Sequence, residues 1–169
     1  MCAASEPVQE EPAYNDAVLL LSVLIGVIAG LRTMMAPAAI SWAASLGWLN
    51  LAPTSLAFFG YRFTPWILSV LAIGELITDQ LPTTPSRTVP IQFGARIVSG
   101  GVCGAAIGAA SGSLTTGAIG GVIGAVIGTL GGRAVRGWMA KAFGSDRPAA
   151  FIEDAVAIAG AWLIMAAAR

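Results

Sequence analysis

The sequence predicts an all-α fold, a polytopic bundle of five to six transmembrane helices, and three observations lead to this prediction. Of the 169 residues, 56% are hydrophobic and only 11% are charged, whereas a soluble domain carries about 25% charged residues. The apolar residues are grouped in segments that turn residues separate, and two neighbouring segments carry glycine at every fourth position. Because so few polar residues cannot cover a water-exposed surface, we expect the lipid bilayer to surround most of the chain.

The N-terminal residues differ in composition from the rest of the chain. Residues 1–16 contain four acids and no Lys or Arg, which predicts a disordered acidic tail. A secretory signal peptide would need a basic region before its apolar stretch, so this segment is not interpreted as one. Residues 17–169 are expected to form a single transmembrane helical domain.

Six apolar segments follow the tail, at residues 17–31, 34–49, 64–81, 91–111, 117–135 and 149–168. A membrane crossing needs about 20 helical residues, and the first two segments are shorter than that. They form either a hairpin that turns at Arg32 and Thr33, or one long helix that is broken in its middle. A single helix over both would be about 50 Å long, which exceeds the hydrocarbon core. Pro37 disfavours helical geometry in the residue before it, so the hairpin is the favoured interpretation.

Turn residues mark the remaining boundaries. The string "LPTTPSRTVP" has three prolines in ten residues and is expected to end the third helix. The polar string "SGSLTTG" separates the fourth and fifth segments. In "FGSDRPAA", Ser145 or Asp146 can cap the sixth helix, with Pro148 near its first turn.

The basic residues favour one orientation in the membrane. If the N-terminus is outside and six helices cross, Arg62 and Arg169 lie outside. The other seven then lie at the cytoplasmic end: Arg32, Arg87, Arg96, Arg133, Arg136, Lys141 and Arg147. This distribution follows the positive-inside rule. A five-helix version with the N-terminus inside gives the same placement after residue 50, so both versions stay open.

Two glycine runs predict how the fourth and fifth helices pack. The strings "GGVCGAAIGAASG" and "GGVIGAVIGTLGG" place glycines at Gly100, Gly104, Gly108 and Gly112, and at Gly120, Gly124, Gly128 and Gly132. A spacing of four puts each set on one helix face, and small residues let helices in a bilayer approach closely. We therefore expect a glycine-zipper pair, with the two faces in contact with each other or with partner helices of a homo-oligomer or another membrane subunit.

Charged residues predict a polar site at the cytoplasmic end of the bundle. Glu75 and Asp79 are four residues apart and share one face of the third helix. Ionisable residues at membrane depth are costly and are usually paired or functional. The candidate polar site consists of Arg32, Glu75, Asp79, Arg87, Arg96, Arg133, Glu153 and Asp154.

Two interpretations of this candidate site stay open. One is a ring of ion pairs that fixes helix ends and orientation. The other is a polar vestibule that binds an ion or small solute, or relays protons. The chain around Gly30, Arg32 and Pro37 is typical of broken helices that line substrate sites in transporters, and also of a plain turn with an arginine that extends to the interface.

Several classes of function are excluded by what the sequence lacks. There is no histidine, which removes the commonest proton shuttle and metal ligand. No nucleotide-binding loop, paired Cys-x-x-Cys or Ser/His pair is present, so we expect no enzyme, no cofactor and no metal site. Nine basic residues balance nine acidic ones, which gives no reason to expect a nucleic-acid partner.

Five strings together resemble a known family. They are "AGLRTMMAPAA", "GELITDQLPTTPSRT", "GARIVSGGVCGAAIG", the second glycine run and "FIEDAVAIA". Over residues 17–168 the chain resembles the uncharacterised bacterial integral-membrane family called domain of unknown function 4126. The resemblance implies a small multi-pass protein of the bacterial inner membrane, and it implies no activity.

Two functions are therefore expected from the sequence. The first is a small transporter or channel-like protein with the charged residues at its cytoplasmic end. The alternative is a non-catalytic structural or accessory subunit that assembles through its glycine-rich helix faces.

Overall fold

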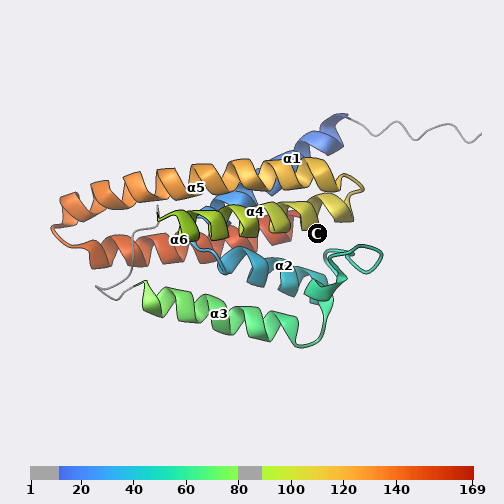
Figure 1. The fold of residues 1–169 in the computed structure, drawn as a ribbon, viewed down its shortest axis with the longest axis horizontal. Coiled ribbons are helices and arrows are strands. Elements are labelled where there is room, and N and C mark those ends of the chain that lie inside the picture. Colours follow the sequence, from blue (N-terminus) through green and yellow to red (C-terminus); the bar gives the residue numbers. More distant parts are fainter. Residues whose placement is uncertain (1–11, 80–88) are drawn as a thin grey trace, which may run out of the picture.

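The computed structural model describes residues 12–79 and 89–169, and these residues form helices without any strand. The elements are α1 (Pro12–Leu31), α2 (Met35–Ser45), the short 3-10 helix η1 (Ala57–Gly60), α3 (Thr64–Thr78), α4 (Pro90–Ala110), α5 (Leu114–Phe143) and α6 (Asp146–Ala167). The helices lie roughly along one direction and form an elongated bundle (Figure 1). The all-α prediction is therefore confirmed for the described residues.

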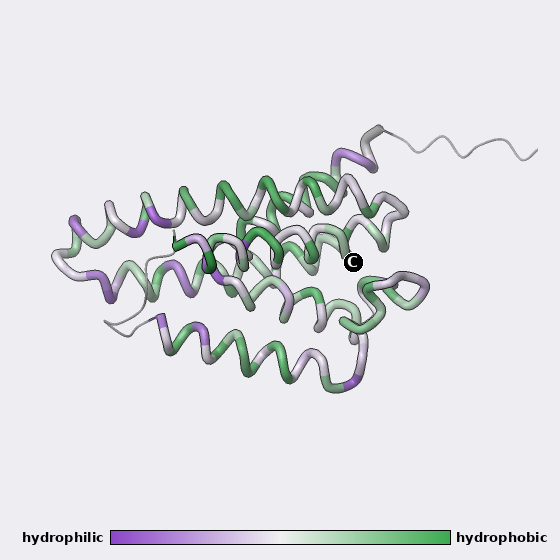
Figure 2. Tube along the Cα trace, in the orientation of Figure 1, coloured by the Kyte–Doolittle hydropathy of each residue, from purple (hydrophilic) through white to green (hydrophobic). Residues whose placement is uncertain are grey.

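Four of these helices, α1, α4, α5 and α6, are long and apolar enough to cross a membrane. The helix α3 is apolar but has 15 residues, and α2 has 11, so α2 is about 16 Å long against a hydrocarbon core of about 30 Å. Hydrophilic residues gather toward the helix ends, while the middle of the bundle is apolar (Figure 2). The chain is thus a multi-pass membrane protein.

The chain reverses direction between α1 and α2, and residues 32–34 join the two helices. Figure 1 shows that α2 returns toward the end of the bundle at which α1 begins, and that the C-terminus lies at this same end. The structure thus has the two separate helices of the hairpin interpretation, and the single long helix is wrong.

Some helix boundaries differ from those expected. The helix α1 begins at Pro12, so the last five residues of the predicted disordered tail are helical, while residues 1–11 lie outside the described residues. The helix α5 continues to Phe143, eight residues beyond the expected end at 135. It stops at Gly144, whose φ of 67° lies in the left-handed region that commonly ends helices.

The helix α5 lies between α1 and α4, and its most extensive contacts are with these two. Gly104 of α4 faces Gly117 and Gly121 of α5 with backbone against backbone. A Cβ on Gly121 would overlap the carbonyl oxygen of Gly100 and lie 2.8 Å from its carbonyl carbon. A Cβ on Gly104 would lie 2.8 Å from the Cα of Gly121. Only hydrogen fits at these positions, so α4 and α5 touch through their main chains.

The sequence predicted that the second glycine set faces the fourth helix or a partner helix of another subunit, whereas Gly120, Gly124 and Gly128 pack against α1. A Cβ on Gly124 would lie 2.9 Å from the backbone nitrogen of Val27, and one on Gly128 would lie 2.9 Å from the carbonyl carbon of the same residue. These glycines therefore face α1. Successive residues of a helix point about 100° apart, so Gly120 faces α1 while Gly121 faces α4.

Two further predicted packing glycines have other positions. Gly112 lies in the turn between α4 and α5 with a φ of 80°, a conformation that favours glycine, so its role is in the turn. Gly132 is partly exposed near the charged end of α5.

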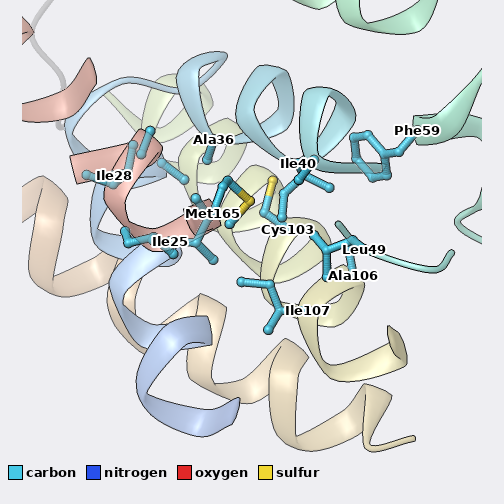
Figure 3. Packing of buried hydrophobic residues seen from close by; sticks show 14 of the residues in the cluster. Ile25, Ile28, Ala36, Ile40, Leu49, Phe59, Cys103, Ala106, Ile107 and Met165 are labelled. Atoms are coloured by element: carbon cyan, nitrogen blue, oxygen red, sulfur yellow. The ribbon is translucent and has the colours of Figure 1, made fainter. Parts of the chain in front are cut away.

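The apolar core fills the space between α1, α2, α4 and α6 (Figure 3). Ile25, Ile40, Cys103 and Ile107 are at most 2% exposed. The connection between α2 and α3 covers one end of this core, and the hydroxyl of Ser41 donates a 2.6 Å hydrogen bond to a carbonyl of η1. Packing therefore fixes α2 against the spanning helices, although α2 is too short to span.

Candidate functional site

The reversal between α1 and α2 creates a demand for hydrogen-bond partners. The last carbonyls of one helix and the first N–H groups of the next have no partner inside their own helix. Inside a bilayer each unsatisfied backbone group costs several kcal/mol. Side chains from α3, α4 and α5 supply these partners at residues 30–34.

The carbonyls at the end of α1 are bound by α4 and α5. Nη1 of Arg96 donates to the oxygens of Gly30 and Leu31 at 2.6 and 2.7 Å. The hydroxyl of Thr129 lies 3.2 Å from the Gly30 oxygen and 2.8 Å from the oxygen of Ala125, and shares its one proton between them. Arg96 is 2% exposed, so it is a structural cation buried against helix α1.

The N–H groups at the start of α2 are bound by α3. The two carboxylate oxygens of Glu75 accept hydrogen bonds of 2.7 Å from the backbone nitrogens of Thr33 and Met34, one each. The helix α2 has no side-chain cap of its own. Glu75 therefore acts as its cap from another helix, where the helix dipole also favours a negative charge.

Arg32 is the centre of the site and is fully buried. Its Nη1 donates to Asp79 at the end of α3. Its Nη2 contacts Asp154 of α6 as an ion pair without the alignment of a hydrogen bond. A guanidinium removed from water is tolerated only with such partners, so three separate parts of the fold meet at this one side chain.

We name this group the Arg32 cluster, and it consists of Arg32, Glu75, Asp79, Arg96 and Asp154. Nη2 of Arg96 lies 3.9 Å from Oε1 of Glu75, which connects the two halves of the cluster. With all groups ionised, three carboxylates face two guanidiniums, so the cluster carries one net negative charge. Each charged group of the cluster is paired with another member of the cluster.

Three predicted site residues lie elsewhere. Oε2 of Glu153 lies 3.5 Å from Nη1 of Arg136. The Nε and Nη2 atoms of Arg136 donate hydrogen bonds of 2.9 and 2.5 Å to Asp146. Arg133 lies on the outer face of α5 and lines a shallow groove there. Arg87 lies outside the described residues. The structure thus brings together five of the eight predicted residues in the Arg32 cluster.

Sequence reasoning missed two hydroxyls that serve the Arg32 cluster and one arginine, Arg136, that binds acids of α6 beside it. Thr129 binds the end of α1, and Ser99 donates a 2.6 Å hydrogen bond to the carbonyl of Thr33. Thr129 lies in the second glycine run and Ser99 directly before the first, and a hydroxyl in such an apolar segment is a signal that could have identified them. Arg136 was used only to orient the chain in the membrane.

An apolar groove lies beside the site. A groove of about 460 Å³ lies between α2, α3 and α6, and Met35, Trp42, Leu76, Ile158 and Trp162 are among its lining residues. None of its lining residues is charged. Within residues 12–79 and 89–169, no three His, Cys, Asp or Glu residues are grouped so as to hold a metal ion.

Comparison with known proteins gives one match. No curated protein and no solved structure is significantly similar to this chain. A family model described as a domain of unknown function matches residues 19–168, which is nearly the whole chain. The helical bundle with its buried Arg32 cluster therefore belongs to the family DUF4126, the domain of unknown function 4126.

Proposed function

We propose that the protein is a small transporter or channel-like protein for a small ion or solute, located in the bacterial inner membrane with its charged end in the cytoplasm. The observation that carries the proposal is the full burial of Arg32 between Asp79 of α3 and Asp154 of α6. Charged residues inside membrane proteins usually mark pathways for ions or substrates. No catalytic role and no cofactor belong to this proposal.

The break between α1 and α2 supports the proposal. In transporters, interrupted helices direct the backbone dipoles of their ends at a ligand near the middle of the membrane. Here Glu75 occupies the amide end and Arg96 the carbonyl end. The Nε–H of Arg32 is buried and has no hydrogen-bond partner among the described residues, so it is a donor that a small anion or water can use.

The attachment of α3 also supports the proposal. Its helix contacts are with α2 and η1, and the apolar groove separates part of its inner face from α6. Glu75 and Asp79 connect the end of α3 to the rest of the bundle. A movement of α3 would therefore release both acids from the Arg32 cluster and expose the break between α1 and α2.

Flux measurements in liposomes test the proposal. Purified protein is reconstituted, and the flux of protons, monovalent cations and small anions such as acetate is compared with empty liposomes. Removing one member of a buried ion pair costs about 3–5 kcal/mol, so Asp79→Asn and Glu75→Gln should weaken the closed state and raise the flux at least tenfold.

The matched control is Asp146→Asn, which removes an exposed carboxylate that pairs with Arg136. Its flux should equal that of the unchanged protein. The proposal is wrong if folded protein gives no flux above empty liposomes for any of these solutes. An unchanged rate in the double variant of Glu75 and Asp79 would remove these residues from the mechanism.

A structural or accessory subunit is the second candidate, and the apolar groove favours it. The groove is bordered by Trp42, Trp48 and Trp162, which gives a partner helix a surface to bind. The glycine sets are less suitable for assembly, because Gly124 and Gly128 already contact α1. If the protein is such a subunit, filling the groove with Ala39→Trp should release partners on a native gel, while flux stays absent.

A further inference from the structure

A second hollow lies on the outer face of α5, at the charged end of the bundle. It is a shallow groove of about 400 Å³ that is lined by Leu130, Arg133, Ala134, Gly137, Trp138 and Lys141. Two of these residues are cations, and no acid lines the groove. Gly137 has no side chain to occupy the hollow, and a Cβ there would meet nothing within 4 Å.

An apolar stripe continues from this groove toward the middle of the bilayer. Ile123, Ile127 and Leu130 are 47%, 54% and 51% exposed. They lie on the same face of α5 as the groove, because the positions are spaced by three or four residues. Trp138, which is 71% exposed, borders the basic part, as aromatic residues do at membrane interfaces. The face therefore changes from apolar to basic along one line.

The length of α5 puts the basic part at headgroup depth. The helix has 30 residues and is about 45 Å long, whereas the hydrocarbon core is about 30 Å thick. Thr129 contacts Gly30 near the end of the spanning helix α1, and Arg133 lies four residues, about 6 Å, farther along α5. Side chains lean toward the N-terminus of their helix, so Lys141 leans back toward Gly137 and the bilayer.

We infer that this groove binds an anionic phospholipid of the cytoplasmic leaflet. The lipid phosphate lies beside Lys141 above Gly137, and one acyl chain follows Leu130 and Ile127. Charge complementarity and the continuous apolar stripe both fit this ligand, since basic pockets at the cytoplasmic side of membrane proteins recognise anionic headgroups. The inference is independent of transport.

Native mass spectrometry of the purified protein tests the site with phosphatidylglycerol and phosphatidylcholine of identical acyl chains. The unchanged protein should retain phosphatidylglycerol in preference. Lys141→Gln should weaken its binding about fivefold, because one basic residue near an anionic membrane surface contributes about 1 kcal/mol. Gly137→Leu should remove the preference by filling the hollow, and should keep the melting temperature because the space at its Cβ is open.

The matched control is Arg147→Gln, which removes one positive charge from an exposed position at the same end of the bundle. It should leave the lipid preference unchanged. Equal retention of the two lipids, or equal effects of the Lys141 and Arg147 variants, would overturn the inference. It also fails if inorganic phosphate displaces the lipid at equal concentration, or if Gly137→Leu dissociates a dimer, because the groove would then be a general anion site or an interface between copies.

Discussion

Replacing Gly121 by alanine is the sharpest perturbation of the fold. The added Cβ would overlap the carbonyl oxygen of Gly100 and lie 2.8 Å from its carbonyl carbon, where ordinary contact begins at 3.4 Å. It would also lie 3.0 Å from the Cα of Gly104. All three neighbours are main-chain atoms of α4, so no side chain can rotate away. The carbonyl carbon alone requires the helices to separate by 0.6 Å, and the overlapping oxygen requires more.

The expected loss of stability follows from that separation. A gap of about 0.5–1 Å removes a quarter to a half of the dispersion attraction between facing atoms. Overpacking in well-packed interiors costs about 1–3 kcal/mol, and the rigid backbone neighbours put Gly121→Ala at the upper end of this range. At Gly131 a Cβ would meet nothing within 4 Å, so Gly131→Ala should gain up to about 1 kcal/mol from helix propensity.

The free energy of unfolding is measured by steric trapping in bicelles for three variants of α5. Gly121→Ala should lie about 3 kcal/mol below Gly131→Ala. Gly120→Ala should be intermediate, because its nearest neighbours lie at 3.1 Å, farther than those of Gly121, and one of them is the flexible end of Leu19. If Gly121→Ala and Gly131→Ala unfold with equal free energy, the close approach of α4 and α5 is wrong. If Gly120→Ala is the most damaging, the assignment of glycine faces is wrong.

Three further predictions concern buried polar contacts. Arg32→Met leaves Asp79 and Asp154 without their guanidinium and should lower the free energy of unfolding by about 3–5 kcal/mol. The triple variant that also carries Asp79→Asn and Asp154→Asn should recover most of this loss. Glu75→Gln keeps only one acceptor oxygen for the two amides at the start of α2, so one amide loses its partner at a cost of about 1–3 kcal/mol, which hydrogen exchange at these amides measures. Ser41→Ala removes the donor to the η1 carbonyl and should cost about 1–2 kcal/mol, read as a lower melting temperature.

Controls for these predictions come from exposed residues. Arg62→Met removes an exposed cation at the opposite end of the bundle and should leave stability unchanged. Equal losses in the Arg32 and Arg62 variants would contradict the role of the Arg32 cluster. For Glu75→Gln, exchange that accelerates equally along all of α2 would indicate general loosening instead of the loss of a cap. Ser45→Ala, at an exposed hydroxyl, is the control for Ser41.

Much of the fold follows from the sequence, because a bilayer constrains it strongly. Segment length and prolines predicted the separate helices and the turn at Arg32 and Thr33. The positions of the charged residues at the helix ends predicted that Arg32, Glu75 and Asp79 would lie together at one end of the bundle. What the sequence could not determine is which partner each side chain binds, because that depends on how each helix is rotated against its neighbours. Glu75 and Asp79 share a face of α3, yet one binds amides and the other a guanidinium.

The glycine faces show the same limit. The two glycine runs share the same glycine spacing, which suggested that Gly100 and its set face Gly120 and its set. The helix α5 has two close neighbours and needs small residues toward both, so Gly121, outside the matched spacing, meets α4. Arg133 and Arg136 are three residues apart, and only contacts in three dimensions reveal that Arg136 binds the acids of α6.

The way the break between α1 and α2 is satisfied has a consequence for biosynthesis. Its partners, Glu75, Arg96 and Thr129, all come later in the chain than the break itself. When the ribosome has made only the first 50 residues, the exposed amides and carbonyls at the turn can be matched only by water or by the insertion machinery. The turn of the N-terminal hairpin therefore gains its partners inside the protein only after Glu75 and Arg96 have been inserted.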